Sequence, residues 1–260
     1  MQLLSSVLKS LKVLDLFTEE MPELSLTQIS RLVNSHKSSV FRILNTLDRA
    51  GFLEKNKKTN KYRLGLKLVE LANRVLNSYS LREIASSYME ELAEKTGEII
   101  HLSILDGMEI VYLEKKGQGQ PVTVGTKVGG RNPAYASAMG KVLLAGLPEQ
   151  EFRELLGKVT LKKFTPNTIS EVPDLIKELE TVRKRGYAVD DEETFLGIRC
   201  VAAPIKDSEG KVVAAMSVTV PKLRMNKRRM RELRRLVIDT AQKISERSAG
   251  IKEGLIKKGS

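Results

Sequence analysis

The apolar residues of the first 65 positions change from helical to strand spacing, and this change limits the fold more than any other feature. Apolar side chains recur every three or four residues in three successive stretches. The first covers residues 5–20, the second ends near Asn34 and the third stops at Gly51. This spacing predicts three amphipathic helices. Extended segments at 52–55 and 61–64 follow, with a polar turn between them. Three helices followed by a hairpin predict a winged helix-turn-helix over residues 1–65.

The third predicted helix has a polar face that points away from its apolar side. Val40, Ile43, Leu44 and Leu47 form the side expected to be buried. A helix fits the major groove of DNA with its first residues near the base edges, and Arg42 is suited to a bidentate contact with guanine. Lysines on the hairpin would lie along the DNA backbone or in the minor groove. The candidate DNA-binding residues are Lys37, Ser38, Ser39, Phe41, Arg42 and Asn45 on the helix, and Lys57, Lys58 and Lys61 on the hairpin.

Charge is unevenly distributed along the chain. The net charge is +12, and residues 31–67 carry ten basic and two acidic side chains, a local excess that suits the neutralisation of phosphates. Residues 79–221 have a net charge of −3, whereas residues 222–260 have a net charge of +9, which a solvated surface also explains. The three-helix unit could instead be a protein-binding module whose polar face is only solvated, with Phe41 as a packing residue. The three hairpin lysines favour the DNA-binding interpretation over the protein-binding one.

The rest of the chain is predicted to contain a linker, a second domain and a tail. Apolar residues lie widely around the predicted helix 66–78, so we take 66–80 as a linker that is buried in a dimer or wedged between domains. Over 99–221, hairpins alternate with helices, which predicts an α+β domain, and we take 81–250 as its bounds. Residues 251–260 form a basic tail.

Two further predictions concern the middle of this second domain. Residues 122–128 are predicted to form a strand, and a glycine-rich loop at 129–133 leads to a helix that runs from Ser137 to Leu147. Amide groups at a helix start bind carboxylates.

Ser217 and Thr219 alternate in an apolar strand, so both hydroxyls face one side. They bind either a polar small molecule or the neighbouring backbone.

The residue content argues against catalysis and metal binding. The single cysteine, Cys200, excludes an intramolecular disulfide, and the two histidines, His36 and His101, argue against a metal site. There is no Gly-x-Ser-x-Gly motif and no complete phosphate-binding loop, so we expect neither an enzyme nor a cofactor. Because no apolar run approaches ~18 residues and no secretory signal begins the sequence, we expect a cytoplasmic protein without a membrane partner.

Two acidic or nucleophilic features have plain structural interpretations. Four consecutive acids, Asp190 to Glu193, resemble a catalytic carboxylate pair but are more typical of a solvated or helix-starting segment. Cys200 lies in an apolar strand without an obvious base, which is typical of a buried and unreactive thiol. His101 also lies in a strand and is interpreted as a satisfied core or edge histidine.

Three segments of the chain resemble the IclR-type bacterial transcriptional regulators. They are LSLTQISRLVNSHKSSVFRILNTLDRAGFLEKNKKTNKYRLG, AYASAMGKVLLAG and RKRGYAVDDEETFLGIRCVAAPIKDSEGKVVAAMSVTVP. The resemblance implies a winged helix-turn-helix, a GAF-like effector-binding domain, and a dimer or dimer of dimers (a homotetramer) on a palindromic operator. Tyr135 stands where the family commonly has histidine, and Met139 is bulkier than its counterpart in some small-acid sensors. The effector-binding residues implied are Val124, Asn132, Ala138, Met139, Asp190, Ile198, Cys200, Ser217 and Thr219.

The leading hypothesis is therefore a sequence-specific regulator, repressor or activator, of a catabolic operon that senses a small organic acid or related metabolite. Effector binding would shift a population between two dimer arrangements through the helix at 66–78 and so change the spacing of two recognition helices. One alternative is an enzyme of small carboxylic acids with a helical appendage. Another is an interaction scaffold that uses its basic helices without DNA.

Overall fold

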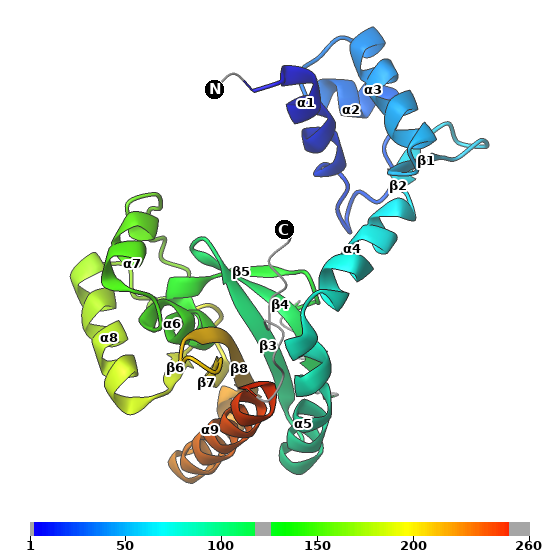
Figure 1. Cartoon of the computed structure of the whole chain (residues 1–260). Coiled ribbons are helices and arrows are strands. Elements are labelled where there is room, and N and C mark those ends of the chain that lie inside the picture. Colours follow the sequence, from blue (N-terminus) through cyan, green and yellow to red (C-terminus); the bar gives the residue numbers. More distant parts are fainter. Residues whose placement is uncertain (1–2, 118–125, 250–260) are drawn as a thin grey trace. The chain divides into compact units, whose positions relative to one another are not determined.

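The computed structural model describes residues 3–117 and 126–249, which form two compact units that divide between Asn77 and Ser78 (Figure 1). The first unit contains a two-stranded sheet and the second a six-stranded sheet. Each unit therefore has a core of its own. This arrangement confirms the predicted α+β fold with two domains.

The first unit is a winged helix-turn-helix. Ser25 begins its second helix with a capping box, because its hydroxyl accepts from the Gln28 N–H at 3.3 Å and its own N–H donates to Gln28 Oε1 at 2.9 Å. The buried side chains come from all three helices and both strands, and they are Val13, Leu24, Ile29, Val40, Leu44, Leu53 and Tyr62. The elements are α1 (Ser5–Leu14), α2 (Leu26–Leu32), α3 (Lys37–Arg49), β1 (Leu53–Lys55), β2 (Tyr62–Leu64) and α4 (Lys67–Asn77).

The first helix is shorter than the predicted 5–20, because it ends at Leu14. The N–H of Asp15 still reaches Leu11 O, but Leu16 and Phe17 donate to the carbonyls three residues before them, a tighter turn that ends α-helices. Leu16 and Phe17 nevertheless pack against the core. The apolar spacing therefore located the buried side chains correctly and overestimated the length of the helix.

The hairpin of the first unit is fixed at its base by a close backbone approach. Leu53 pairs with Leu64 and Lys55 with Tyr62 in an antiparallel register. At Gly65, a side chain has no room, since a Cβ atom would lie 2.2 Å from the carbonyl oxygen of Gly51. The N–H of Gly65 also donates to Phe52 O at 2.8 Å. Glycine is therefore required where the wing ends.

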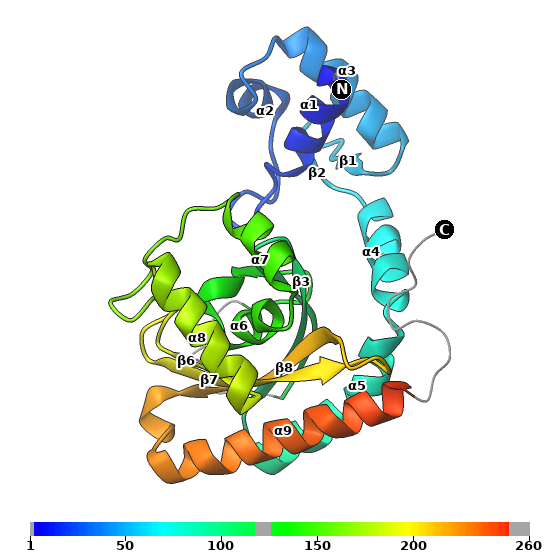
Figure 2. The ribbon, with the colours of Figure 1, turned by 60° about the vertical axis from the view of Figure 1, so that its left-hand side comes forward.

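The second unit is an antiparallel sheet of order β5-β4-β3-β8-β7-β6 with helices on both faces. In Figure 2, α5 and α9 cover one face, and α6, α7 and α8 lie on the other. Its strands are β3 (Ile99–Asp106), β4 (Glu109–Lys116), β5 (Arg131–Pro133), β6 (Ala188–Asp191), β7 (Ile198–Lys206) and β8 (Val212–Pro221). Its helices are α5 (Ser80–Thr96), α6 (Ala138–Ala145), α7 (Glu149–Leu156), α8 (Val172–Arg185) and α9 (Lys227–Ala249), with short 3₁₀ turns η1 (Ala134–Ala136) and η2 (Lys222–Arg224).

Two predictions for this unit need correction. The described end of the predicted strand 122–128, residues 126–128, is not a strand, and the rest of that segment lies outside the described residues. The edge strand beside β4 is β5, within the stretch predicted to be a glycine-rich loop, where Arg131 pairs with Val111. Helix α7 was not predicted. Pro173 opens α8 near Val172, three residues earlier than the predicted start at Leu175.

Candidate functional site

The polar face of α3 is open to solvent. Val40 and Leu44 are buried, and Ile43 and Leu47 pack against the same core. The structure places Lys37, Ser38, Ser39 and Arg42 at exposed positions, Phe41 with 44% of its surface exposed, and Asn45 half-buried. The predicted division of this helix into a buried and a free face is therefore present, and Phe41 lies on the free face.

The wing carries its lysines at the surface. Asn56 shapes the turn, because its Oδ1 accepts from the N–H groups of Lys58 at 2.9 Å and Thr59 at 3.3 Å. Lys57, Lys58 and Lys61 are exposed. Among the described residues, no carboxylate forms an ion pair with these lysines, whereas Arg63 on the same hairpin is paired with Glu54 at 2.9 Å. The hairpin thus presents three cations that are available to phosphates.

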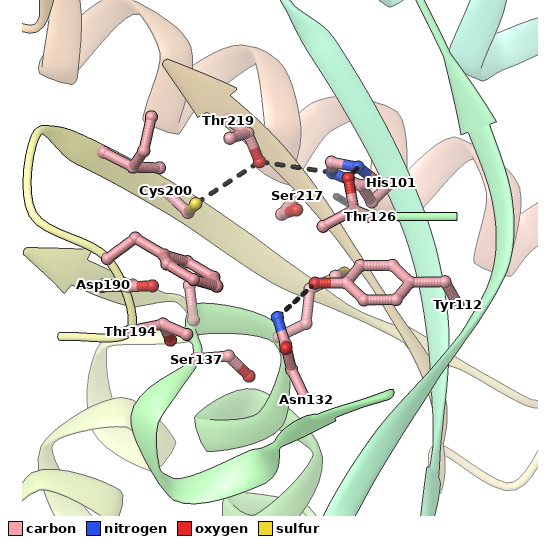
Figure 3. A pocket seen from close by; sticks show the side chains of 14 residues that line it. His101, Tyr112, Thr126, Asn132, Ser137, Asp190, Thr194, Cys200, Ser217 and Thr219 are labelled. Atoms are coloured by element: carbon pink, nitrogen blue, oxygen red, sulfur yellow. Dashed lines mark hydrogen bonds between the residues drawn. The ribbon is translucent and has the colours of Figure 1, made fainter. Parts of the chain in front are cut away.

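A pocket opens in the second unit between the sheet, the start of α6 and the segment that follows β6 (Figure 3). The empty space in and in front of it, with the open mouth and adjoining solvent counted, is about 400 Å³. Eight of the nine predicted effector-binding residues line it, and the ninth, Val124, lies outside the described residues. The eight are Asn132, Ala138, Met139, Asp190, Ile198, Cys200, Ser217 and Thr219.

Strand register brings these distant residues together. Asp190 pairs with Cys200, and Cys200 pairs with Thr219, so three strands place their side chains in one row. In the neighbouring row, His101 pairs with Ser217 and Ser217 with Ala202. Ala202 and Ala188 are small and belong to the cluster that packs against α6. Small residues in this row therefore bring α6 close to the sheet beside the pocket.

The polar wall of the pocket is a chain of contacts across three strands and a loop. His101 Nε2 lies 2.8 Å from Thr126 Oγ1, and His101 Nδ1 lies 3.3 Å from Thr219 Oγ1. Thr219 Oγ1 is also 3.3 Å from Cys200 Sγ. Burial, with a smaller contribution from Lys115, lowers the pKa of His101 to about 3, so the ring is neutral at pH 7. Thr219 thus bonds to side chains of the pocket rather than to the neighbouring backbone.

The start of α6 forms another part of the wall. Ser137 is the N-cap, and its hydroxyl accepts from the Gly140 N–H at 3.1 Å. Gly140 allows this helix to lie against η1, because a Cβ atom there would be 2.1 Å from Ala134 O. Met139 lines the pocket and accepts a hydrogen bond from Ser103 at its sulfur, 3.2 Å away. Tyr135 does not line the pocket, and its hydroxyl donates to Lys162 O at 3.0 Å.

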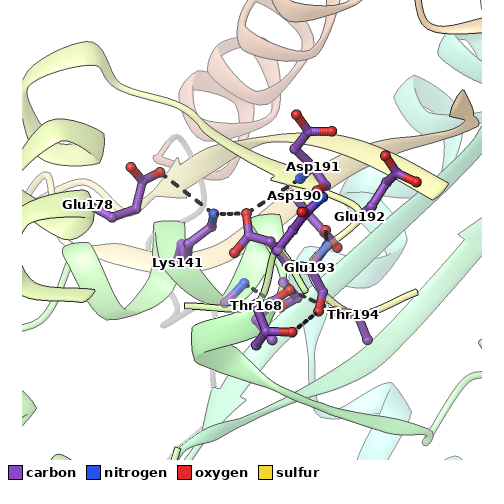
Figure 4. A network of polar contacts seen from close by, with 12 residues as sticks. Lys141, Thr168, Glu178, Asp190, Asp191, Glu192, Glu193 and Thr194 are labelled. Carbon is purple, nitrogen blue, oxygen red and sulfur yellow. Dashed lines mark hydrogen bonds and ion pairs between the residues drawn. The ribbon is translucent and has the colours of Figure 1, made fainter. Parts of the chain in front are cut away.

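The acidic run 190–193 is not the solvated segment that the sequence suggested. Asp190, Glu192 and Glu193 are buried, and Asp191 is exposed. Lys141, 1% exposed, lies 2.5 Å from Glu193 Oε1 (Figure 4). Burial and, to a smaller extent, the charge of Glu193 raise the pKa of Asp190 to about 7, against the opposing effects of Lys141 and of backbone hydrogen bonds. The pocket therefore contains a carboxyl group whose charge changes near physiological pH.

Sequence reasoning missed six lining residues: His101, Tyr112, Thr126, Ser137, Thr194 and Phe195. His101 gave a usable signal, since a histidine in an apolar strand opposite Ser217 marks a polar patch on the sheet. Tyr112 accepts a hydrogen bond from Asn132 Nδ2 at 2.9 Å, but its apolar neighbours in β4 give no hint of this role. Burial raises the pKa of the Cys200 thiol, in agreement with the expected unreactive cysteine.

Over the described ranges 3–117 and 126–249, no group of three or more histidine, cysteine, aspartate or glutamate residues could hold a metal ion. Within the same ranges, every helix is too short or too polar to cross a membrane. These findings concern only the part of the chain that the structure describes.

Comparison with known proteins matches both units. Residues 6–57 match the family model "IclR helix-turn-helix domain", and residues 73–246 match "Bacterial transcriptional regulator IclR C-terminal". The HTH-type transcriptional regulator XynR of Escherichia coli is 41% identical over 219 residues, covering 84% of this chain and 87% of XynR.

Two solved structures extend the likeness to the whole fold. The crystal structure of Thermotoga maritima IclR is 34% identical, with a TM-score of 0.78, and the match covers 94% of this chain and 98% of that one. An IclR homologue from Microbacterium hydrocarbonoxydans, crystallised with 4-hydroxybenzoate, is 27% identical with a TM-score of 0.80 and covers 94% of this chain and 100% of that one.

Proposed function

Because the chain belongs to the IclR family of bacterial transcriptional regulators, a family of DNA-binding proteins and not of enzymes, we propose that it controls a catabolic operon in response to a small organic acid. The observation that carries this proposal is the pairing of an exposed basic helix-and-wing surface in one unit with a polar pocket in the other. Repression and activation both fit this arrangement. Because the operator that it would bind lies in the chromosome, we also propose a cytoplasmic location.

The free face of α3 supports sequence reading in the major groove. Arg42 is exposed near the helix start, where its guanidinium can form two hydrogen bonds with guanine. Ser38 and Ser39 are short, so the backbone can approach the phosphates. Lys57, Lys58 and Lys61 supply contacts that do not depend on the base sequence. The proposed DNA contacts also include Lys37, Phe41 and Asn45.

The pocket supports binding of a carboxylate. Ala138 and Met139 lie at the N-terminal end of α6, where backbone N–H groups attract anions. Asp190, Cys200, Ser217 and Thr219 form the polar part of the site, and Asn132 and Ile198 complete it. The Microbacterium homologue was crystallised with 4-hydroxybenzoate, a carboxylate. We therefore propose a small organic acid as the effector.

Self-association is supported by the apolar surface of α1 and α4. Leu4, Val7 and Leu11 of the first helical stretch are 72%, 51% and 53% exposed. Helix α4 has no buried residue, and its Val69 and Val75 are each 56% exposed. Exposed apolar patches of this kind mark protein interfaces. A dimer, alone or as half of a tetramer, would cover them and would pair two α3 helices on a palindromic site.

The proposed mechanism is a shift of population between two dimer arrangements. An effector that binds one arrangement better changes their ratio by its difference in affinity. Helix α4 joins the winged helix-turn-helix to the rest of the chain and is the element expected to carry the change to the two α3 helices.

Two measurements on the full chain test this function. Fluorescence anisotropy with the DNA upstream of its own gene should show a specific complex that weakens as salt rises. A thermal-shift screen with organic, sugar and aromatic acids should find a ligand that raises the melting temperature and changes the operator affinity. Equal affinity for operator and random DNA would instead indicate a scaffold, and turnover of a screened acid would indicate an enzyme.

A further inference from the structure

Two buried residues behind the pocket connect two residues that line it. Lys141 lies three residues after Ala138 in α6, and Glu193 lies three residues after Asp190. Their side chains form an ion pair with Nζ and Oε1 2.5 Å apart, and they are 1% and 8% exposed. The pair thus links the helix that begins at the pocket to the segment that carries Asp190.

Glu193 contacts Asp190 directly as well. Its N–H donates to Asp190 Oδ1 at 2.7 Å. Its carbonyl oxygen accepts from Thr168 Oγ1 at 2.6 Å and from Thr165 Oγ1 at 3.3 Å. Glu193 is therefore held on three sides, and Figure 4 shows it between Lys141 and the start of the acidic run. Glu193 therefore connects its ion pair with Lys141 to Asp190 through its own backbone.

The fully charged neighbours of Asp190 are few. Burial lowers the pKa of His101 and raises the pKa values of Tyr112 and Cys200, so these three lining groups are uncharged at pH 7. Farther out, Lys141 lies 3.7 Å from Glu178 on α8, which is paired with Arg185 at 2.8 Å. Lys141 on α6 and Glu193 after β6 therefore dominate the electrostatic field at Asp190.

This cluster has more carboxyl groups than cations. Lys141 is paired with Glu193 and its charge also acts on Asp190, whereas Glu178 has Arg185 as its closer partner. Within the described residues, Glu193 Oε2 is buried without a hydrogen-bond partner. Burial also raises the pKa of Glu193. A buried cluster with surplus negative charge is stabilised by taking up a proton.

We propose that Lys141 and Glu193 are positioning residues of the effector pocket that hold Asp190 in place and, together with its burial, set the balance between the neutral and the charged form of its carboxyl group when a ligand arrives. The inference rests on the proposed function, because it concerns the same pocket. A neutral Asp190 donates a hydrogen bond to a carboxylate, whereas a charged one repels it. The pocket then binds an organic acid in its anionic form together with one proton.

The test needs no ligand. The full chain is labelled with ¹³C at its aspartate carboxyl carbons, the Asp190 resonance is assigned with Asp190→Asn, and its titration is followed by NMR. Glu193→Gln removes a negative neighbour and should lower the Asp190 midpoint by about one pH unit, while Lys141→Met removes a cation and should raise it by about as much. Shifts in opposite directions distinguish electrostatic control from a structural disturbance, which has no reason to depend on the sign of the lost charge.

Matched variants complete the experiment. Asp191→Asn removes a neighbouring charge that is 56% exposed and paired with Arg199, so solvent screening should keep its effect below about 0.3 pH unit. The double variant Lys141→Met/Glu193→Gln removes both charges and should return the midpoint toward that of the unaltered chain. It replaces the single Lys141 variant in the experiment if that variant does not fold, because it leaves no unpaired buried charge.

Two outcomes would overturn the proposal: an unchanged midpoint in Glu193→Gln, or the same direction of shift in both single variants. Failure of the unaltered chain to bind DNA would reject the proposed function and leave these midpoints unaffected. The two failures are therefore distinguishable.

Discussion

Thr219 Oγ1 lies 3.3 Å from His101 Nδ1, although the two residues are 118 positions apart in the sequence. The contact joins the two central strands of the sheet, β8 and β3. It places a neutral imidazole beside the hydroxyl that also meets Cys200. The polar character of the pocket therefore depends on a residue whose sequence context suggested a satisfied core or edge histidine.

His101→Phe tests the energetic weight of this contact. The substitution keeps an aromatic ring and removes both nitrogens, so buried hydroxyl groups lose a partner, and the free energy of unfolding should fall by about 1–3 kcal/mol. Urea denaturation measures this free energy of unfolding. Tyr112→Phe is the control, because it removes only the hydroxyl that accepts from Asn132 and should cost about 1 kcal/mol. Unchanged stability of His101→Phe would show that the ring nitrogens contribute nothing.

Asp190 should make stability depend on pH. Burial raises its pKa from 3.8 to about 7, so between these values the folded state binds more protons than the unfolded state, and stability falls as pH rises. His101, whose pKa is lowered from 6.5 to about 3, acts in the opposite sense over an overlapping range.

The difference between Asp190→Asn and the unaltered chain isolates the Asp190 contribution. The variant should gain roughly 2–4 kcal/mol relative to the unaltered chain on going from pH 4 to pH 8. Urea denaturation at both pH values measures this gain. A difference that does not vary with pH would contradict the raised pKa.

Arg42→Ala and Lys58→Ala should weaken DNA binding in different ways. Loss of a bidentate base contact costs about 1–3 kcal/mol and relaxes the choice of base at one position. Loss of a phosphate contact weakens all sequences alike and lowers the salt slope by about one. Anisotropy titrations with operator and single-base variants at several salt concentrations separate the two. Identical effects would indicate that Arg42 contacts only the backbone.

Gly140→Ala should destabilise the second unit. The new methyl group would lie 2.1 Å from Ala134 O, so α6 must move, at about 1–3 kcal/mol. Gly157→Ala is a matched control, since its nearest contact is 3.6 Å away and its φ of −63° suits alanine. This control should be neutral or slightly stabilising. Chemical denaturation compares the free energies of unfolding of the two variants. Equal values would contradict the close approach of Gly140 to the Ala134 carbonyl oxygen.

Leu4→Ser with Leu11→Ser should weaken self-association. Both side chains are more than half exposed, at 72% and 53%, so the fold tolerates the change while an interface would lose apolar area. Sedimentation velocity should show a smaller species at micromolar concentration. Leu223→Ser, at a fully exposed position, serves as the control. An unchanged sedimentation coefficient in the double variant would exclude α1 from the interface.

The sequence predicted the first unit better than the second. In the winged helix-turn-helix, local signals such as the Ser25 capping box and Gly51 at a φ of 77° coincide with element ends. In the second unit, β5 is only three residues long and exists through its pairing with β4, a non-local contact that spacing does not reveal. The acidic run 190–193 was misinterpreted for the same reason, because Lys141 lies 52 residues away.

Alternation along β8 separates two groups of side chains. Ser217 and Thr219 face the pocket, while Met216, Val218 and Val220 are buried and, with the period of two, point toward the opposite face. If the pocket holds the effector as proposed, substitutions at the first group should alter which metabolite is recognised without disturbing the layer beneath. A change of ligand preference would then need only one side chain, on an architecture that stays the same.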